Sequence, residues 1–221
     1  MDMLPEWITV LGPYMPGFLN ASWLVLVLTL LVIVLSWVFG LVAALGKASR
    51  FAVFRQASTF YIWFIRGTPT LIQIFIVYFG LPQFGLRLSP FVAGVIALGI
   101  NSGAYVAEIV RSGLMAIPKG QMESSLALGL SRFDAMRRII LPQVFRIIVP
   151  PLTNEAISTL KNTSLLSTIT VVELTLYSQT IIATTFRPFE FYTATAVIYL
   201  LLTTILSQFA AWAERHYARR T

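Results

Sequence analysis

The chain has 221 residues, of which 57% are hydrophobic and 11% are charged, and its formal net charge is +7. A soluble domain is about 45–50% apolar and about 25% charged, so this composition excludes a secreted domain, a disordered chain and most soluble enzyme folds. It indicates an integral membrane protein, in which the excess of Lys and Arg marks the cytoplasmic side rather than a nucleic-acid site.

The residue inventory also limits the chemistry. The absence of cysteine excludes disulfides, thiolate nucleophiles and cysteine metal ligands. The single histidine, His216, lies in a charged tail, where a solvated side chain is the simpler interpretation. The segment 40–48 is similar to a phosphate-binding loop, but Ala48 replaces the Ser or Thr that binds magnesium. We therefore expect no catalytic residue, no metal site and no cofactor in this chain.

Five apolar stretches are long enough to cross a bilayer as helices. A membrane helix needs roughly 20 apolar residues, and only helices or closed barrels satisfy the backbone in lipid. In chain order, the predicted spans are residues 23–45, 60–81, 91–107, 147–167 and 191–213. The sequence thus predicts an all-α membrane protein with five transmembrane helices in a single domain, residues 1–221.

Basic residues are distributed unevenly between the links that join these spans. Those that follow the first, third and fifth spans are Lys47, Arg50, Arg55, Arg111, Lys119, Arg132, Arg137, Arg138, Arg146, Arg215, Arg219 and Arg220. The opposite links hold Arg87 and Arg187. Because basic residues are retained in cytoplasmic links, we expect the N-terminus outside and the C-terminus in the cytoplasm.

The long cytoplasmic link, about residues 112–145, reads as two short helices with a tight turn. Pro118 can begin the first helix and Gly129 suits its end. Ser131 begins a capping-box pattern for the second helix, which we expect to stop before Pro142. The physical pattern leaves two interpretations open: an interfacial helix pair on anionic lipid, or a docking element for a cytoplasmic partner.

The same link carries a family pattern. Glu123-Ser124-Ser125, then Gly129 after three residues, then Ile139-Ile140-Leu141-Pro142 after nine more, resembles the EAA loop of ABC importer permeases. The two serines replace the alanines of the family pattern. They are small, so we expect close helix packing to survive.

Three flanking segments narrow the resemblance to the polar amino acid branch of this family. The first is Arg66-Gly67-Thr68-Pro69 with Gln73. The second runs from Asn101 to Tyr105 and continues to Glu108 and Arg111. The third runs from Pro150 to Glu155, followed by Lys161 to Leu165. The resemblance covers about residues 24–215.

The resemblance implies a set of partners in the bacterial inner membrane. Such permeases pair with an identical or sister permease, and two cytoplasmic ATPase subunits, which bind the ATP and magnesium, dock on their EAA loops. An external solute-binding protein delivers the amino acid. The residues expected to dock the ATPase are Lys119, Glu123, Ser124, Ser125, Gly129 and Ser131. A solvated carboxylate remains the alternative interpretation of Glu123.

Polar residues inside the predicted spans are candidates for the substrate path, since such groups usually face a pore or a partner. Asn101, Tyr105 and Glu108 share one helical face. On the fourth span, Asn154, Ser158 and Lys161 share a face, and Glu155 lies on the adjacent one. Glu155 could accept an ammonium group. The groups that could bind either end of an amino acid are Gln73, Asn101, Asn154, Ser158 and Thr163.

Structural roles are the alternative for the charged candidates. Glu108 with Arg111, or Glu155 with Lys161, could form ion pairs that hold the bundle together, and Arg66 reads as structural. Proline residues at positions 150 and 151 lack N–H donors, so we expect the fourth span to loosen there. A carboxylate beside loosened carbonyls would suit an ammonium group.

The sequence thus predicts a permease subunit of an ATP-driven, binding-protein-dependent amino acid importer that works by alternating access. A permease for another small polar solute is the alternative within the family. An intramembrane enzyme is disfavoured, because no nucleophile–base constellation is visible.

Overall fold

The computed structural model describes residues 10–218, which are almost entirely helical and contain no strand. The long helices are α2 (Met15–Lys47), α5 (Pro90–Met115), α8 (Leu141–Asn162) and α10 (Pro188–Ala218). The shorter ones are η1 (Gly12–Tyr14), α3 (Ala52–Gly67), α4 (Thr70–Phe75), η2 (Ile76–Gly80), η3 (Leu81–Phe84), α6 (Lys119–Ala127), α7 (Arg132–Ala135), η4 (Met136–Ile140), η5 (Thr163–Ile169) and α9 (Leu174–Thr185). The predicted all-α class is confirmed.

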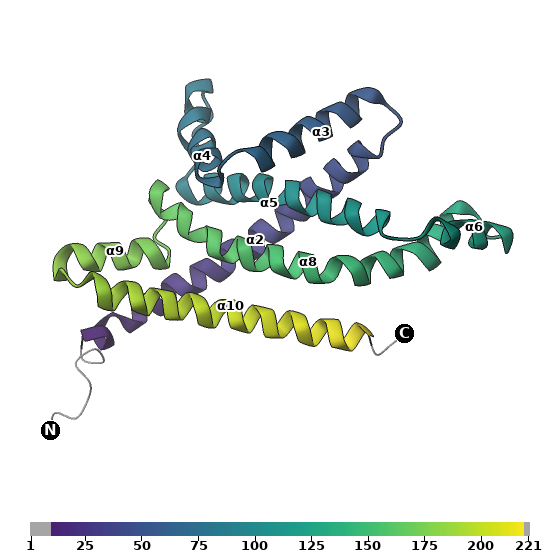
Figure 1. The fold of residues 1–221 in the computed structure, drawn as a ribbon. Helices are drawn as coiled ribbons and strands as arrows, with labels where there is room; N and C mark the ends of the chain where they lie inside the picture. Colours follow the sequence, from purple (N-terminus) through teal and green to yellow (C-terminus); the bar gives the residue numbers. More distant parts are fainter. Residues whose placement is uncertain (1–9, 219–221) are drawn as a thin grey trace.

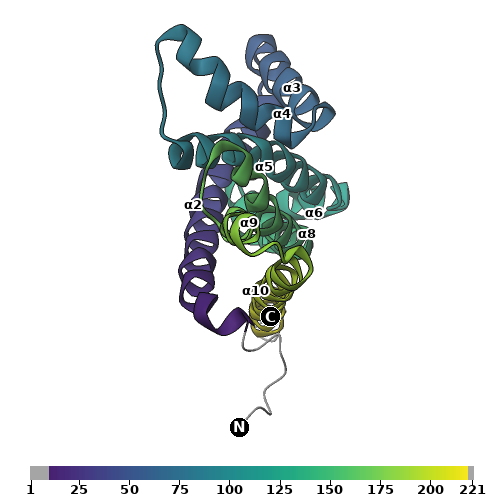
Figure 2. The same ribbon diagram turned by 90° about the vertical axis from the view of Figure 1, so that its left-hand side faces the viewer.

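The helices form an elongated bundle with projections at its ends. In Figure 1, α2 crosses α5 and α8, and α10 lies beside α8. The α6 helix lies at one end of the bundle. Helix α4 projects away from the bundle, as the turned view in Figure 2 also shows. Three helical segments, 12–47, 90–115 and 188–212, are long and apolar enough to cross a membrane, and up to five spans result if each of two bent pairs is counted as one.

Large apolar side chains cover much of the bundle's outer surface. On α2, Trp23 is 68% exposed and Leu45 is 72% exposed. On α10, Leu200 and Ile205 are each 65% exposed. A soluble monomer rarely exposes apolar patches of this extent, so these faces suit contact with lipid or with other membrane helices.

Small residues let α2 and α5 approach closely. A Cβ atom at Gly103 of α5 would meet Phe39 Cβ at 2.7 Å and Tyr61 Oη at 2.9 Å, and one at Gly40 of α2 would meet Gly103 O at 3.0 Å. The Tyr61 hydroxyl also donates to Ile100 O at 2.6 Å and ties α3 to the same site. Small interfacial residues are the usual means by which membrane helices pack without a hydrophobic driving force.

Two apolar clusters fill the interior along the part of α2 that precedes Gly40. One joins Leu28 and Val32 of α2 to Ile74 of α4, Ala97 of α5 and Leu166 of η5. The other brings together residues from α2, α8, α9 and α10: Phe18, Val25, Leu160, Leu174 and Phe191. The two clusters thus join α2 to α4, α5, η5, α8, α9 and α10.

The prediction of one continuous second span, residues 60–81, is wrong. Helix α3 begins at Ala52 and ends at Gly67, and the chain resumes as α4 and η2 at an angle of 113°. Thr68 and Pro69 are both extended, with ψ of 149° and 135°. Proline pushes the residue before it out of the helical region, so the break follows from the local sequence.

The fourth span also differs from its prediction, residues 147–167. Helix α8 runs from Leu141 to Asn162 and then tightens into the 3₁₀ segment η5. The loop helix does not stop before Pro142, because Pro142 lies in the first turn of α8, where its missing N–H is tolerated. Pro150 and Pro151 lack N–H donors but do not break the helix, since both lie inside α8. Neighbouring membrane helices can support a helix through such prolines.

Helix α9 was not predicted from the sequence. Its N-cap is Glu173, whose carboxylate accepts from Thr175 N at 2.8 Å and Leu176 N at 3.0 Å. The same carboxylate accepts from the Tyr199 hydroxyl of α10 at 2.7 Å, and the Glu173 side chain is completely buried. One acidic side chain thus begins α9 and fastens it to α10.

We predict that Gly103→Ala lowers the thermal unfolding midpoint of the detergent-purified protein. The new methyl group would press on Phe39 and Tyr61, and overpacking of this kind typically costs about 1–3 kcal/mol. Gly12→Ala is the matched control, because nothing lies within 4 Å of a Cβ atom at Gly12. Equal midpoints for the two variants would contradict the close approach of α2 and α5.

Candidate functional site

Two of the predicted path residues, Gln73 and Asn101, bond to each other. Asn101 Nδ2 donates to Gln73 Oε1 at 2.9 Å, and both side chains are buried. Gln73 Nε2 in turn donates to Ile65 O at 2.8 Å and to Thr68 Oγ1 at 2.7 Å. The pair therefore satisfies the backbone at the bend between α3 and α4 and fixes that bend against α5.

Glu155 of α8 bonds to α5 rather than within its own helix. Ser102 Oγ donates to Glu155 Oε1 at 2.7 Å and lies 3.2 Å from Thr159 Oγ1. The Lys161 side chain is exposed. The ion pair considered for Glu155 and Lys161 is replaced by a hydroxyl–carboxylate bond between α5 and α8.

The other predicted residues of the fourth span are dispersed. Asn154 is exposed and Ser158 is partly buried. Thr163 is completely buried, and its hydroxyl donates to Leu160 O at 2.7 Å, one turn earlier. Thr163 is therefore engaged by its own helix, and the structure does not bring it together with Asn154.

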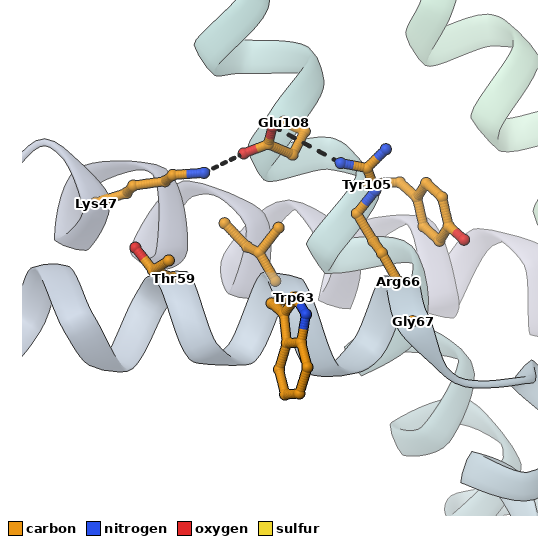
Figure 3. A pocket seen from close by; sticks show the side chains of 8 residues that line it. Lys47, Thr59, Trp63, Arg66, Gly67, Tyr105 and Glu108 are labelled. Atoms are coloured by element: carbon orange, nitrogen blue, oxygen red, sulfur yellow. Dashed lines mark hydrogen bonds and ion pairs between the residues drawn. The ribbon is translucent and has the colours of Figure 1, made fainter.

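A cluster of charged residues surrounds Glu108 in the part of the bundle where α2, α3 and α5 meet (Figure 3). Lys47 Nζ lies 2.7 Å from Glu108 Oε1, and Arg111 NH2 lies 2.8 Å from Oε2. Arg66 NH1 is more distant, at 3.7 Å, and its guanidinium lies 5.4 Å from the centre of the Tyr105 ring. The pairing of Glu108 with Arg111 considered from the sequence is confirmed.

Lys47 and Arg66 were not predicted as partners of Glu108. They lie 61 and 42 residues earlier in the chain, so no local spacing connects them to it. A groove of about 480 Å³ opens beside the cluster, and Thr59, Trp63 and Tyr105 contribute to its walls. Thr59 and Trp63 are further residues that sequence reasoning missed.

The predicted docking loop forms a compact projection. Helix α6 ends at Ala127 with Leu128 as its C-cap, and Gly129 follows with φ of +83°. Ser131 Oγ accepts from Asp134 N at 3.1 Å, so both predicted capping features are confirmed. Ser125 is 4% exposed and donates to Gln121 O, and it therefore faces the interior of the loop. The other predicted docking residues are exposed: Lys119, Glu123, Ser124, Gly129 and Ser131.

Apolar contacts hold this loop against the bundle. Met122 of α6 packs on a buried cluster formed by Ile140, Val144 and Ile148. Large apolar side chains face outward next to it, with Leu128 84% exposed and Phe133 71% exposed. Among residues 10–212, whose side chains the structure describes, no group of three or more Asp, Glu or His side chains is arranged to hold a metal ion.

Comparison with known proteins identifies the family of this fold. Residues 36–219 match the family described as the binding-protein-dependent transport system inner membrane component. The chain is 39% identical over 212 residues to the glutamine transport system permease protein GlnP of Escherichia coli (strain K12), covering 95% of this chain and 96% of that protein. It is 38% identical to the octopine transport system permease protein OccM of Rhizobium radiobacter, covering 95% of each.

A solved structure agrees with these relatives. The crystal structure of an amino acid ABC transporter with histidines superimposes with a TM-score of 0.90 at 39% identity, covering 97% of this chain and all of that chain. The relatives are transport permeases rather than enzymes. The resemblance drawn from the sequence motifs is confirmed: the chain belongs to the binding-protein-dependent transport system inner membrane components, the permease subunits of ABC importers.

Proposed function

We propose that this protein forms the translocation pathway of an ATP-driven amino acid importer and works by alternating access. The observation that carries the proposal is the 39% identity, over nearly the whole chain, both to a glutamine permease and to an amino acid ABC transporter of known structure. The buried polar groups on α5 suit a substrate that carries both an ammonium and a carboxylate group.

The proposed assembly follows from the family. Two permeases, identical or sister, would share two cytoplasmic ABC ATPase subunits and receive the amino acid from an external binding protein. ATP and magnesium would be bound by the ATPase, so the permease needs no cofactor. The chain, residues 1–221 as one domain, would cross the bacterial inner membrane five times, if each bent helix pair is one span.

The proposed substrate path lies along α5 where it faces α4 and α8. Glu155 is the acceptor for the substrate ammonium, because its carboxylate is partly exposed and bonded to a hydroxyl rather than a cation. Asn101 Nδ2 donates to Gln73 Oε1, and Gln73 Nε2 donates to Ile65 O and Thr68 Oγ1. These donors can serve the substrate only if their present bonds open during the transport cycle.

The function is tested with the purified permease–ATPase complex, its binding protein and a panel of L-glutamine, L-histidine and octopine. We expect an ATPase to co-purify and its activity to rise with at least one loaded binding protein. A complex that contains an ATPase but responds to none of these substrates would favour another polar solute.

We predict that the N-terminus faces outside and that the α6 loop faces the cytoplasm. The chain has no cysteine, so Gln83→Cys and Ser131→Cys each place a single thiol at opposite predicted sides. An impermeant thiol reagent added to intact cells should label the first variant and spare the second. The reverse labelling would overturn both the topology and the docking argument.

We predict that Gly129→Val uncouples or disassembles the complex while the membrane bundle stays folded. Valine is strongly disfavoured at φ of +83°, so the turn that positions α6 must distort. Gly120→Val is the matched control: neither glycine has an atom within 4 Å of a new Cβ, but Gly120 has ordinary helical geometry. ATPase co-purification should fall only for Gly129→Val. Its full retention would mean that this turn does not position the coupling element.

We predict that Glu155→Gln weakens substrate-stimulated ATPase activity far more than basal activity. Loss of one charge-assisted hydrogen bond to the substrate lowers affinity about 10- to 150-fold, which is read from the dependence of the rate on loaded binding protein. Ser102→Ala is the control, because it removes the bond to Glu155 and keeps the carboxylate. If both variants lose equal activity, Glu155 acts through its bond to α5 and not on the substrate.

A further inference from the structure

The cluster around Glu108 contains more positive than negative charge. Lys47, Arg66 and Arg111 all lie within 4 Å of Glu108, and the single carboxylate leaves an excess of two positive charges. The side chains of Lys47, Arg66 and Arg111 are partly exposed, and basic pockets on the cytoplasmic side of membrane helices attract anions. The excess therefore favours binding of a second anion at this place.

The charge excess faces an open groove rather than the packed core. Lys47, Arg66 and Glu108 all line the groove, and the Arg66 side chain is 45% exposed. Arg66 also makes the longest contact with Glu108, at 3.7 Å, whereas Lys47 and Arg111 lie within 2.8 Å. Arg66 is thus the cation that Glu108 engages least, and its guanidinium can turn to another anion without breaking a short ion pair.

The groove presents both kinds of group that a zwitterion requires. Arg66 and Lys47 supply donors for a carboxylate, and Arg is well suited to bind it in a bidentate manner. Glu108 Oε2 already accepts from Arg111 at 2.8 Å, and the Arg66 guanidinium lies over the Tyr105 ring. An ammonium group can reach Oε2 and the ring face only where Arg66 turns to the substrate carboxylate. The volume, about 480 Å³, lies inside the range of about 300–1,000 Å³ that is usual for small-molecule pockets.

The groove continues the polar face of α5 beyond Asn101. Tyr105 lies one turn after Asn101, and Glu108 lies about one turn further, toward the end of α5 that leads to the α6 loop. Lys47 ends α2 on the same side. A substrate that leaves the Asn101 and Glu155 region toward the cytoplasm would therefore meet this groove next.

We propose that this groove is a second amino acid site on the cytoplasmic side of the pathway, in which Arg66 and Lys47 bind the substrate carboxylate and Glu108 binds its ammonium. The proposal rests on the proposed amino acid transport function. It gives substrate-binding roles to Lys47 and Arg66. The sequence analysis placed Lys47 in a cytoplasmic link and interpreted Arg66 as structural.

An anionic lipid headgroup offers the same oxyanion chemistry, since basic pockets between membrane helices on the cytoplasmic side bind such headgroups. The acceptor at the centre of the cluster favours the amino acid. An anionic lipid phosphate cannot pair with the carboxylate oxygen Glu108 Oε2, whereas an ammonium group can donate a hydrogen bond to it. The continuity with Asn101 along α5 points the same way.

A single cysteine in the groove tests the proposal in the permease–ATPase complex in nanodiscs. Thr59→Cys places a thiol in the groove wall, and Gln56→Cys, one turn earlier on α3 and outside this groove, is the matched control. Modification rates are measured with an anionic and a cationic methanethiosulfonate reagent. Because clefts lined by one sign of charge concentrate counter-ions about 10-fold or more, the anionic-to-cationic rate ratio should be about tenfold higher at Thr59→Cys.

Protection by substrate then identifies the occupant. L-glutamine or L-histidine, whichever stimulates the wild-type ATPase, should slow modification of Thr59→Cys, and its methyl ester should not. Adding Arg66→Gln to Thr59→Cys should abolish protection, and adding Arg55→Gln, on the same helix but away from Glu108, should leave it intact. Arg66→Lys should restore part of the protection, which a purely structural arginine would not do.

Four results would overturn the proposal. Equal protection by the methyl ester would show that the groove does not recognise the substrate carboxylate. Protection that depends on phosphatidylglycerol in the nanodisc and not on amino acid would assign the groove to a lipid headgroup. Absence of protection in a complex whose ATPase does respond to the amino acid would reject the site while leaving the proposed function intact. A wild-type complex that responds to no amino acid would reject both.

Discussion

Polar groups in the interior of a bilayer have no water with which to form hydrogen bonds. The hydrogen bonds at the centre of this bundle follow from that constraint. In the described part of the chain, no buried side-chain nitrogen or oxygen atom lacks a hydrogen-bond partner. The amides of Gln73 and Asn101 close the α3–α4 bend, Ser102 bonds Glu155, and Glu173 caps α9. Elements far apart in the chain are joined by the bonds from Asn101 to Gln73, from Ser102 to Glu155 and from Tyr199 to Glu173. Satisfying these polar groups therefore also fixes the architecture.

Helix α5 is the element on which these partnerships converge. Its small residues admit α2 closely on one side, and Ser102 and Asn101 bond α8 and α4 on others. Toward its end, Glu108 gathers cations from α2, α3 and α5 itself. The features proposed to handle substrate and the features that hold the bundle are therefore the same residues. A substrate can bind only by exchanging with bonds that already exist.

The sequence predicted those parts of this arrangement that depend on local patterns. Long apolar runs placed α2, α5 and α10, and the Gly129 and Ser131 signals placed the loop turn, because hydropathy and capping are local properties. The sequence analysis identified the motif that ends at Pro69 but did not predict that the helix breaks there. Partners distant in the chain, such as Lys47 and Glu108 or Ser102 and Glu155, could not be found, because they depend on how helices cross.

Helix α9 shows a second reason why part of the fold could not be predicted from the sequence. The segment 174–185 is too short and too rich in Thr and Ser to stand out as a span, and its start depends on Glu173. An acidic residue between apolar stretches reads as a loop or a surface position, yet here it is completely buried. Its burial is possible because two backbone amides and the Tyr199 hydroxyl donate hydrogen bonds to its carboxylate. The contact with Tyr199 therefore determines the role of Glu173, which the local sequence alone does not.

The geometry also bears on how the loop and the path are connected. The chain runs helically from Arg132 to Ile169, with a π-helical turn, η4, as the joint between α7 and α8. Met122 of α6 packs on Ile140 of that joint and on Val144 of α8. A displacement of α6 would therefore act directly on the same helix that carries Glu155, without an intervening flexible link.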